Sequence, residues 1–187
     1  MTVPIIIQAR FSSSRLPGKV LMPWGDTTLL GHVIDECQRT GLEVWVATSD
    51  QPEDAAVAYE GLAHGSKVYR GSLDDVLGRF VGCVNAMDEE PEAIVRICAD
   101  RPFLNAAFIL AAVRRWNANP WPILRFGEGS LTVEIVRTTA LRHADALATE
   151  LDEREHVTPW LIRMSAHPIE VPSTVDNADD YAFLAPA

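Results

Sequence analysis

Four short apolar runs rich in β-branched residues recur along the first hundred residues of the chain. They cover residues 3–8, 43–48, 67–69 and 93–98, and they end in polar residues. Continuous apolar runs of this length are typical of strands that are covered on both faces. The pattern therefore predicts four buried parallel strands.

Between these runs, apolar residues recur at helical spacing. The three sets that share a helix face are Leu29, Leu30, Val33, Ile34 and Cys37; Ala55, Ala56, Tyr59 and Leu62; and Val76, Leu77, Phe80, Val81 and Val84. Strands that alternate with helices predict an α/β domain, a Rossmann-like, mostly parallel sheet with helices on both faces. Ligands of such sheets bind beyond the carboxyl ends of the strands, so the segments after Gln8, Thr48, Tyr69 and Cys98 are expected to share one crevice.

The pattern of apolar and polar residues in the last third of the chain predicts shorter helices and strands. We expect a helix over residues 105–117, strands at 123–126 and 131–137, helices at 139–149 and 156–164, and a strand near 167–171. No repeat, low-complexity tract or linker interrupts the chain. We therefore expect a single domain over residues 1–187.

Composition narrows the classes of partner. The 187 residues are 48% hydrophobic and carry a formal net charge of −10, which disfavours a nucleic acid polymer because such binding depends on many Lys and Arg contacts to phosphates. No apolar stretch approaches the roughly 18 to 20 residues that a membrane span needs. The three cysteines are widely spaced, so neither a disulfide framework nor a zinc site is indicated. A cytoplasmic location fits best.

The segment directly after the first strand is rich in small residues and cations. It reads Gln8-Ala9-Arg10-Phe11-Ser12-Ser13-Ser14-Arg15-Leu16-Pro17-Gly18-Lys19. Small side chains let backbone amides approach phosphates, while Arg10, Arg15 and Lys19 can offset their negative charge. The spacing is not that of the GxxxxGK[ST] phosphate loop, because Val20 follows Lys19. We expect a site for a free triphosphate.

At this point the sequence resembles the cytidylyltransferases of the acylneuraminate and 3-deoxy-manno-octulosonate type, particularly the spore-coat polysaccharide biosynthesis protein F branch. The resemblance is carried by Ile6–Arg10, Ser14–Leu21, Val46–Ser49, Pro52–Asp54, Tyr69–Ser72, Asp75–Leu77 with Arg79–Phe80, and Arg96–Asp100 with Pro102–Phe103. Weaker similarities are Val133–Ile135, Arg154–Thr158 and Val175–Asp180. The fold that it implies is the nucleotidyltransferase and GT-A glycosyltransferase type.

The resemblance also implies roles for individual residues. Catalysis would fall to Arg10, Lys19 and Asp100, and Mg²⁺ would be held by Asp100 and Asp176. The residues that would bind the nucleotide, CTP, are Gln8, Ala9, Arg10, Ser12, Ser14, Arg15, Lys19, Thr48, Ser49, Asp50, Arg70 and Arg79. Those that would contact the acceptor are Glu134, Arg154 and His156. One carboxylate is enough to begin a magnesium site, because Mg²⁺ completes its octahedron with phosphate oxygens and water.

Several of these residues also have structural interpretations. Ser49 or Asp50 could cap a helix, and Asp74 and Asp75 are more typical of a helix start. Asp100 could pair with Arg101. Arg154 and Glu155 could form an intrahelical ion pair. Asp179 and Asp180 are alternatives to Asp176 as the second metal ligand.

The implied reaction couples CMP from CTP to a small acidic acceptor, a sugar acid or a phosphonate, and releases pyrophosphate. Residues 1–118 would bind the nucleotide and residues 119–187 the acceptor; a homodimer is compatible with the resemblance. One alternative is a GT-A-type glycosyltransferase, although Asp100-Arg101-Pro102 lacks the second aspartate of the DxD motif. The other is a non-catalytic nucleotide-binding module.

Overall fold

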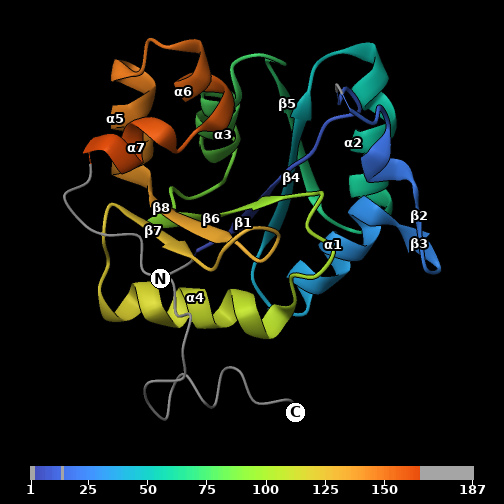
Figure 1. The fold of residues 1–187 in the computed structure, drawn as a ribbon, viewed down its shortest axis with the longest axis horizontal. Coiled ribbons are helices and arrows are strands. Elements are labelled where there is room, and N and C mark those ends of the chain that lie inside the picture. The colour runs from blue at the N-terminus through green and yellow to red at the C-terminus, as the bar shows by residue number, and fades with distance from the viewer. Residues whose placement is uncertain (1–2, 14, 165–187) are drawn as a thin grey trace.

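A six-stranded sheet forms the centre of the computed structural model, which describes residues 3–13 and 15–164 (Figure 1). The strand order is β5-β4-β1-β6-β8-β7, and the first four of these are parallel, whereas β8 runs antiparallel to β6 and to β7. The strands are β1 (Ile5–Gln8), β4 (Val44–Ser49), β5 (Lys67–Gly71), β6 (Ala93–Cys98), β7 (Ile123–Phe126) and β8 (Val133–Arg137). The predicted mostly parallel α/β sheet is confirmed.

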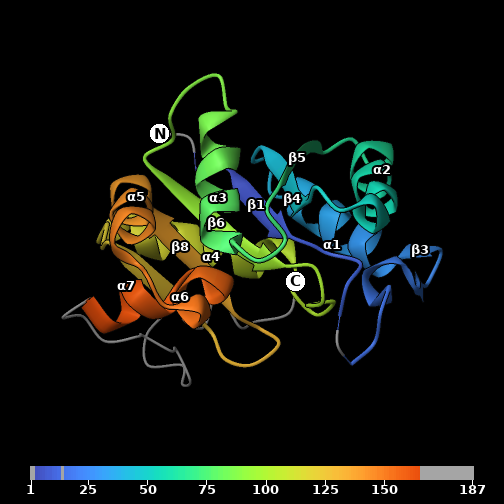
Figure 2. The same ribbon diagram turned by 90° about the horizontal axis from the view of Figure 1, so that it is seen from above.

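Helices cover both faces of this sheet, as Figure 1 shows, and Figure 2 looks from above onto one of these faces. One face carries α1 (Leu29–Gln38), α2 (Ala55–Ala63) and α4 (Ala106–Ala118). The other carries α3 (Val76–Asn85) and α5 (Thr138–Leu147), with α6 (Leu151–His156) and α7 (Pro159–Met164) packed beside them. Smaller elements are the 3₁₀ turns η1 (Lys19–Leu21) and η2 (Pro52–Asp54) and the hairpin of β2 (Pro23–Trp24) and β3 (Thr27–Thr28). None of the helices among the described residues is both long and apolar enough to cross a membrane.

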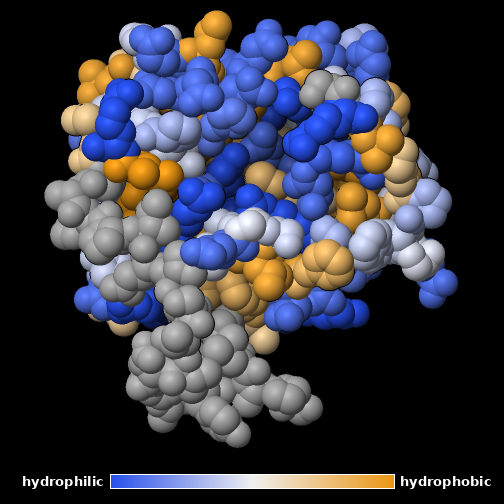
Figure 3. Space-filling view, viewed as in Figure 1, coloured by the Kyte–Doolittle hydropathy of each residue, from blue (hydrophilic) through white to orange (hydrophobic). Residues whose placement is uncertain are grey.

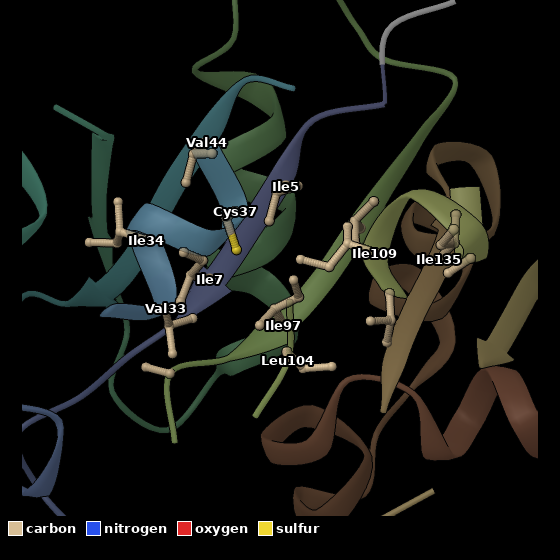
Figure 4. Packing of buried hydrophobic residues seen from close by; sticks show 14 of the residues in the cluster. Ile5, Ile7, Val33, Ile34, Cys37, Val44, Ile97, Leu104, Ile109 and Ile135 are labelled. Atoms are coloured by element: carbon tan, nitrogen blue, oxygen red, sulfur yellow. The ribbon is translucent and has the colours of Figure 1, made fainter. Parts of the chain in front are cut away.

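The alternation of side chains along β1 divides the core into two clusters. Ile5 and Ile7 point toward α1 and α4, where they meet Val33 and Ile109 (Figure 4), whereas Ile6 points toward α3. All three isoleucines of β1 are fully buried. Burial on both faces explains why the central strand is a continuous apolar run.

The buried face of α2 differs from the prediction. Tyr59 and Leu62 are 72% and 61% exposed, whereas Val57, Ala58 and Gly61 are buried. A Cβ at Gly61 would lie only 3.1 to 3.2 Å from neighbouring side chains. The prediction of an inward Tyr59 and Leu62 was wrong because α2 packs closely against the sheet through its small residues.

The helix predicted over residues 156–164 is two helices, α6 and α7. Between them, Val157 has a φ of 69°, and the N–H of Thr158 donates to the carbonyl of His156 at 2.8 Å. A residue before proline avoids the α region, and Pro159 is suited to the first position of a helix. The chain therefore turns sharply here. The strand expected near 167–171 lies outside the described residues.

Candidate active site

The carboxyl ends of β1 and β6 lie side by side where the strand order reverses. Gln8 lies opposite Cys98 in the parallel register, and from there the chain leads to α1 in one direction and to α4 in the other. In open α/β sheets, ligands bind in the crevice at such a switch point. Figure 3 shows strongly hydrophilic residues around a hollow in the middle of this side of the molecule.

Lys19 and Asp100 meet in this crevice. The Lys19 ammonium forms an ion pair with Oδ2 of Asp100, although the two residues are 81 positions apart in the sequence. Both side chains are partly open to solvent. The structure thus brings together a cation of the predicted phosphate loop and the predicted metal carboxylate, and the alternative pairing of Asp100 with Arg101 is not what it shows: Arg101 donates to the carbonyls of Gly129 and Thr132.

The loop between β1 and η1 is fixed at Phe11. The Phe11 N–H donates to the carboxylate of Asp54, and its carbonyl accepts from the Gly18 N–H at 2.8 Å. Gly18 has a φ of 72°, a conformation that favours glycine. Asp54 is 1% exposed and also accepts from the N–H and the hydroxyl of Ser49. These contacts join the loop to the end of β4.

Sequence reasoning gave Asp54 no role of its own. It appeared only inside the Pro52–Asp54 block of the resemblance. The available signal was a carboxylate in the first turn of a helix that follows the polar end of a buried strand. That position puts it beside the neighbouring loop, because parallel strands end at the same edge of the sheet.

The remaining predicted residues of the loop lie at or near the surface, apart from Ala9. Arg10 donates to Oε1 of Glu155 on α6 at 3.0 Å, across 145 positions of sequence. Ser12 and Arg15 are exposed, Ala9 is buried, and Ser14 lies outside the described residues. The Arg10–Glu155 contact brings α6 of the C-terminal third to the predicted phosphate loop.

Four further residues predicted to bind the nucleotide are held differently from one another. Thr48 and Ser49 are fully buried, whereas Asp50 is exposed. Arg70 donates to the carbonyls of Ser49 at 3.0 Å and of Gln51 at 2.8 Å. Its nucleotide contact stays a prediction, as do those of the other three.

Arg79 is a buried cation behind this edge. Its Nη1 donates to the carbonyl of Ser72 at 2.6 Å, while Nε and Nη2 have no hydrogen-bond partner within the part of the chain that the structure describes. Burial lowers the pKa of Arg79 to about 10, which the Asp54 carboxylate partly offsets and the Arg10 charge reinforces. Arg79 therefore adds positive potential beneath the site.

Two residues expected to contact the acceptor form contacts within the protein. Glu134 of β8 forms a buried ion pair with Arg96 and accepts from the Thr158 hydroxyl at 3.1 Å. Arg154 joins α6 to Asp75 at the start of α3 and to Asp145 of α5, at 2.6 and 2.7 Å. These contacts raise the pKa of Arg154. The contacts of Arg154 hold three helices together, and the acceptor roles of Glu134 and Arg154 stay predictions.

The third such residue, His156, is exposed, and its Nε2 lies 3.4 Å from a carboxylate oxygen of Asp152 within the same helix. Within residues 3–13 and 15–164, no side-chain hydrogen bond or ion pair connects it to the crevice, and its acceptor role stays a prediction. Glu155, its neighbour, is the α6 residue that reaches the phosphate loop.

Asp100 fits one half of the expected magnesium site. Its exposed carboxylate offers the hard oxygen ligands that Mg²⁺ prefers, and the ion usually needs only one or two of them from the protein. Among the described residues, no group of three or more His, Cys, Asp or Glu could hold a metal by itself. The second expected ligand, Asp176, and its alternatives Asp179 and Asp180 lie outside those residues.

Comparison with known proteins places this arrangement in a family. The family model of cytidylyltransferases matches residues 4–178. The chain belongs to the cytidylyltransferase family. The family and the enzyme class, a nucleotidyltransferase, are as the resemblance implied, and neither the glycosyltransferase nor the non-catalytic alternative is supported.

Three individual proteins show how similar the chain is to other members of this family. The chain is 37% identical to the spore coat polysaccharide biosynthesis protein SpsF of Bacillus subtilis, covering 96% of this chain and 83% of that protein. It is 31% identical to a 3-deoxy-manno-octulosonate cytidylyltransferase of Hahella chejuensis but spans only 46% of its length. The structure of a cytidylyltransferase from Leptospira borgpetersenii superposes with a TM-score of 0.79 at 27% identity, over 88% of this chain and 72% of that one.

Proposed function

We propose that this cytidylyltransferase transfers CMP from CTP to a small acidic acceptor and releases pyrophosphate. The observation that carries the proposal is the meeting of Lys19 and Asp100 at the switch between β1 and β6. A cation for a triphosphate and a carboxylate for its metal are the two charges that this reaction needs in one place. They come from the segments that follow two neighbouring strands, β1 and β6.

The residues of the site would act mainly through position and charge. An oxygen of the acceptor would attack the α-phosphorus of CTP, and the bond to the departing pyrophosphate would break. Arg10, Arg15 and Lys19 would offset the charge that grows on that leaving group. No covalent enzyme intermediate is needed, because in-line placement of the two substrates supplies much of the acceleration.

Asp100 would hold Mg²⁺, with Asp176 as the second ligand expected from the resemblance. When bound there, the ion supplies positive charge next to the phosphate oxygens. Lys19 would then exchange the Asp100 carboxylate for a phosphate. The ion pair in the structure keeps both side chains at the crevice until substrate enters.

The proposed acceptor class follows from the relatives. Octulosonate, a sugar acid, is the acceptor in the names of several relatives. A small phosphonate is the second candidate. Pyrophosphate release measured with CTP, Mg²⁺ and each of a set of sialic acids, octulosonates, sugar phosphates and phosphonates will identify it.

The decisive substitution is Asp100→Ala. Loss of one preorganised electrostatic group typically slows catalysis by roughly 100- to 1,000-fold, and we expect a loss of that order in pyrophosphate release. Asp88→Ala is the matched control, since this exposed aspartate precedes β6 at the opposite end of the strand. Unchanged turnover in Asp100→Ala would refute the assignment.

A further inference from the structure

A hydrogen bond between two strands fixes the side chain of Gln8 at the carboxyl end of β1. Arg96 of β6 donates from Nη2 to Oε1 of Gln8 at 2.9 Å. A guanidinium has only donors, so this contact requires the amide oxygen of Gln8 to face Arg96. The amide nitrogen, with its two N–H groups, therefore points away from Arg96.

Arg96 is held in turn by β8. Its Nη1 forms the ion pair with Oε2 of Glu134, and Oε1 of Glu134 accepts from Thr158 in the turn between α6 and α7. The guanidinium also lies over the ring of Phe80, 5.9 Å from the ring centre. Arg96 and Glu134 are 9% and 5% exposed. These contacts leave the guanidinium little freedom to turn. The Gln8 amide that it contacts is therefore held in one orientation.

Stability alone does not account for this pair. Burying two charges is costly, and replacement of a buried ion pair by apolar residues is often neutral or stabilising. Gln8, where the network ends, is half-buried and adjoins both the phosphate loop and the crevice between β1 and β6. The chain of contacts that runs from Glu134 through Arg96 to Gln8 therefore ends at the candidate active site.

We propose that Arg96 is a positioning residue for the nucleotide: it fixes the Gln8 amide so that its N–H groups donate to an oxygen of CTP. This inference rests on the proposed function. Without Arg96, the amide can turn over and present its oxygen, which would repel an oxygen of the ligand. Arg96 acts on CTP only through Gln8.

The test is a double-mutant cycle in the full chain. Arg96→Met combined with Glu134→Leu removes both charges together, so that neither is left buried without a partner. The affinity for CTP with Mg²⁺ is measured by calorimetric titration for this pair variant, for Gln8→Ala and for the combination of all three. Thermal unfolding of each variant reports the structural effect separately.

We expect the pair variant and Gln8→Ala each to raise the Kd for CTP about tenfold, the size of one lost hydrogen bond. In the Gln8→Ala background, the pair substitution should raise the Kd no further. The control, Arg142→Met with Glu90→Leu, removes an exposed ion pair elsewhere and should leave the Kd unchanged. If the pair variant does not fold, Arg96→Lys keeps the charge opposite Glu134 but lacks the fork that serves Gln8 as well.

Two results would overturn the inference while leaving the proposed function intact. One is an unchanged Kd in the pair variant. The other is an equal rise in Kd with and without Gln8, which would show that Arg96 acts by another route. Wild-type chain that neither binds CTP nor releases pyrophosphate would overturn the proposed function itself, and this inference with it.

Discussion

Asp54 shapes the phosphate loop by accepting three hydrogen bonds on two oxygens. One oxygen faces the Phe11 N–H, and the other faces the N–H and hydroxyl of Ser49. The side chain of asparagine has one carbonyl oxygen and one amide nitrogen, and only the oxygen accepts. Either the Phe11 N–H or the two donors of Ser49 must therefore lose their acceptor. The position is buried, and water cannot replace the lost partner.

We therefore predict that Asp54→Asn lowers the free energy of unfolding by about 1 to 3 kcal/mol, the cost of a buried donor left without a partner. It should also weaken CTP binding, because the loop is no longer fixed at Phe11. Urea unfolding and CTP titration measure the two effects. Glu53→Gln, on the exposed neighbour, is the control. Equal stability of the two variants would contradict this account.

The chemistry of the site could be predicted at the level of residue types, but the partners of its side chains could not. The cations after β1 and the carboxylate after β6 follow from local sequence and the rule that parallel strands end at one edge. Glu134 and Arg154 were expected to face the acceptor. Their actual partners, Arg96 and Asp75, lie 38 and 79 positions away, a distance at which no local pattern indicates a contact.

At the scale of elements, Asp75 connects two helices. Its carboxylate accepts from the Gly78 N–H at 2.9 Å, which caps α3, and from Arg154 of α6 at 2.8 and 2.6 Å. Partial burial acts to raise the pKa of Asp75, but the hydrogen bonds from Arg154 and Gly78 outweigh it and lower the pKa below the ordinary 3.8. The ionised form is therefore stabilised by folding.

A carboxyl group with a lowered pKa stabilises the fold above its unfolded pKa, and this contribution disappears as the pH falls through the folded value. Asp75→Asn keeps a good helix cap but loses the ion pair with Arg154. We predict a loss of about 0.5 to 1 kcal/mol at pH 7, modest because both partners are partly exposed. The difference from wild type should shrink below about pH 4.

Urea unfolding of both proteins between pH 7 and pH 3 measures this difference. Asp74→Asn serves as the control, since Asp74 is an exposed neighbour outside the helix cap. A gap between wild type and Asp75→Asn that stays constant or widens in acid would show that Asp75 contributes through something other than its charge.

At the scale of the whole molecule, the alternation of apolar runs was enough to predict the parallel half of the sheet. The segments at 123–126 and 131–137 were expected as strands, but not as antiparallel additions next to β6. The periodicity of a segment indicates that it forms a strand in a sheet. Which strand it pairs with, and in which direction, depends on contacts between residues that are distant in sequence. This addition brings Glu134 of β8 to Arg96, and the segment after it brings Glu155 of α6 to Arg10 in the phosphate loop.

The site is thus built from segments spread over most of the described chain, from Gln8 to Thr158, and it exists only in the folded state. A ligand that binds only that state stabilises it by about 2.7 kcal/mol at a concentration 100 times its Kd. For a domain of this size, each kcal/mol raises the Tm by about 2 to 4 °C. We predict that CTP with Mg²⁺ raises the Tm by roughly 5 to 10 °C.

Removal of the metal should reduce that shift, because Asp100 and the triphosphate would then repel each other. Thermal scans with CTP and Mg²⁺, with CTP and a chelator, and with Mg²⁺ alone separate this effect from general screening of the −10 charge. In Asp100→Asn, CTP should raise the Tm by a similar amount with and without Mg²⁺, whereas Asp88→Asn should behave as wild type. A CTP-dependent shift in wild type that is the same with the chelator would show that nucleotide binding does not need the metal.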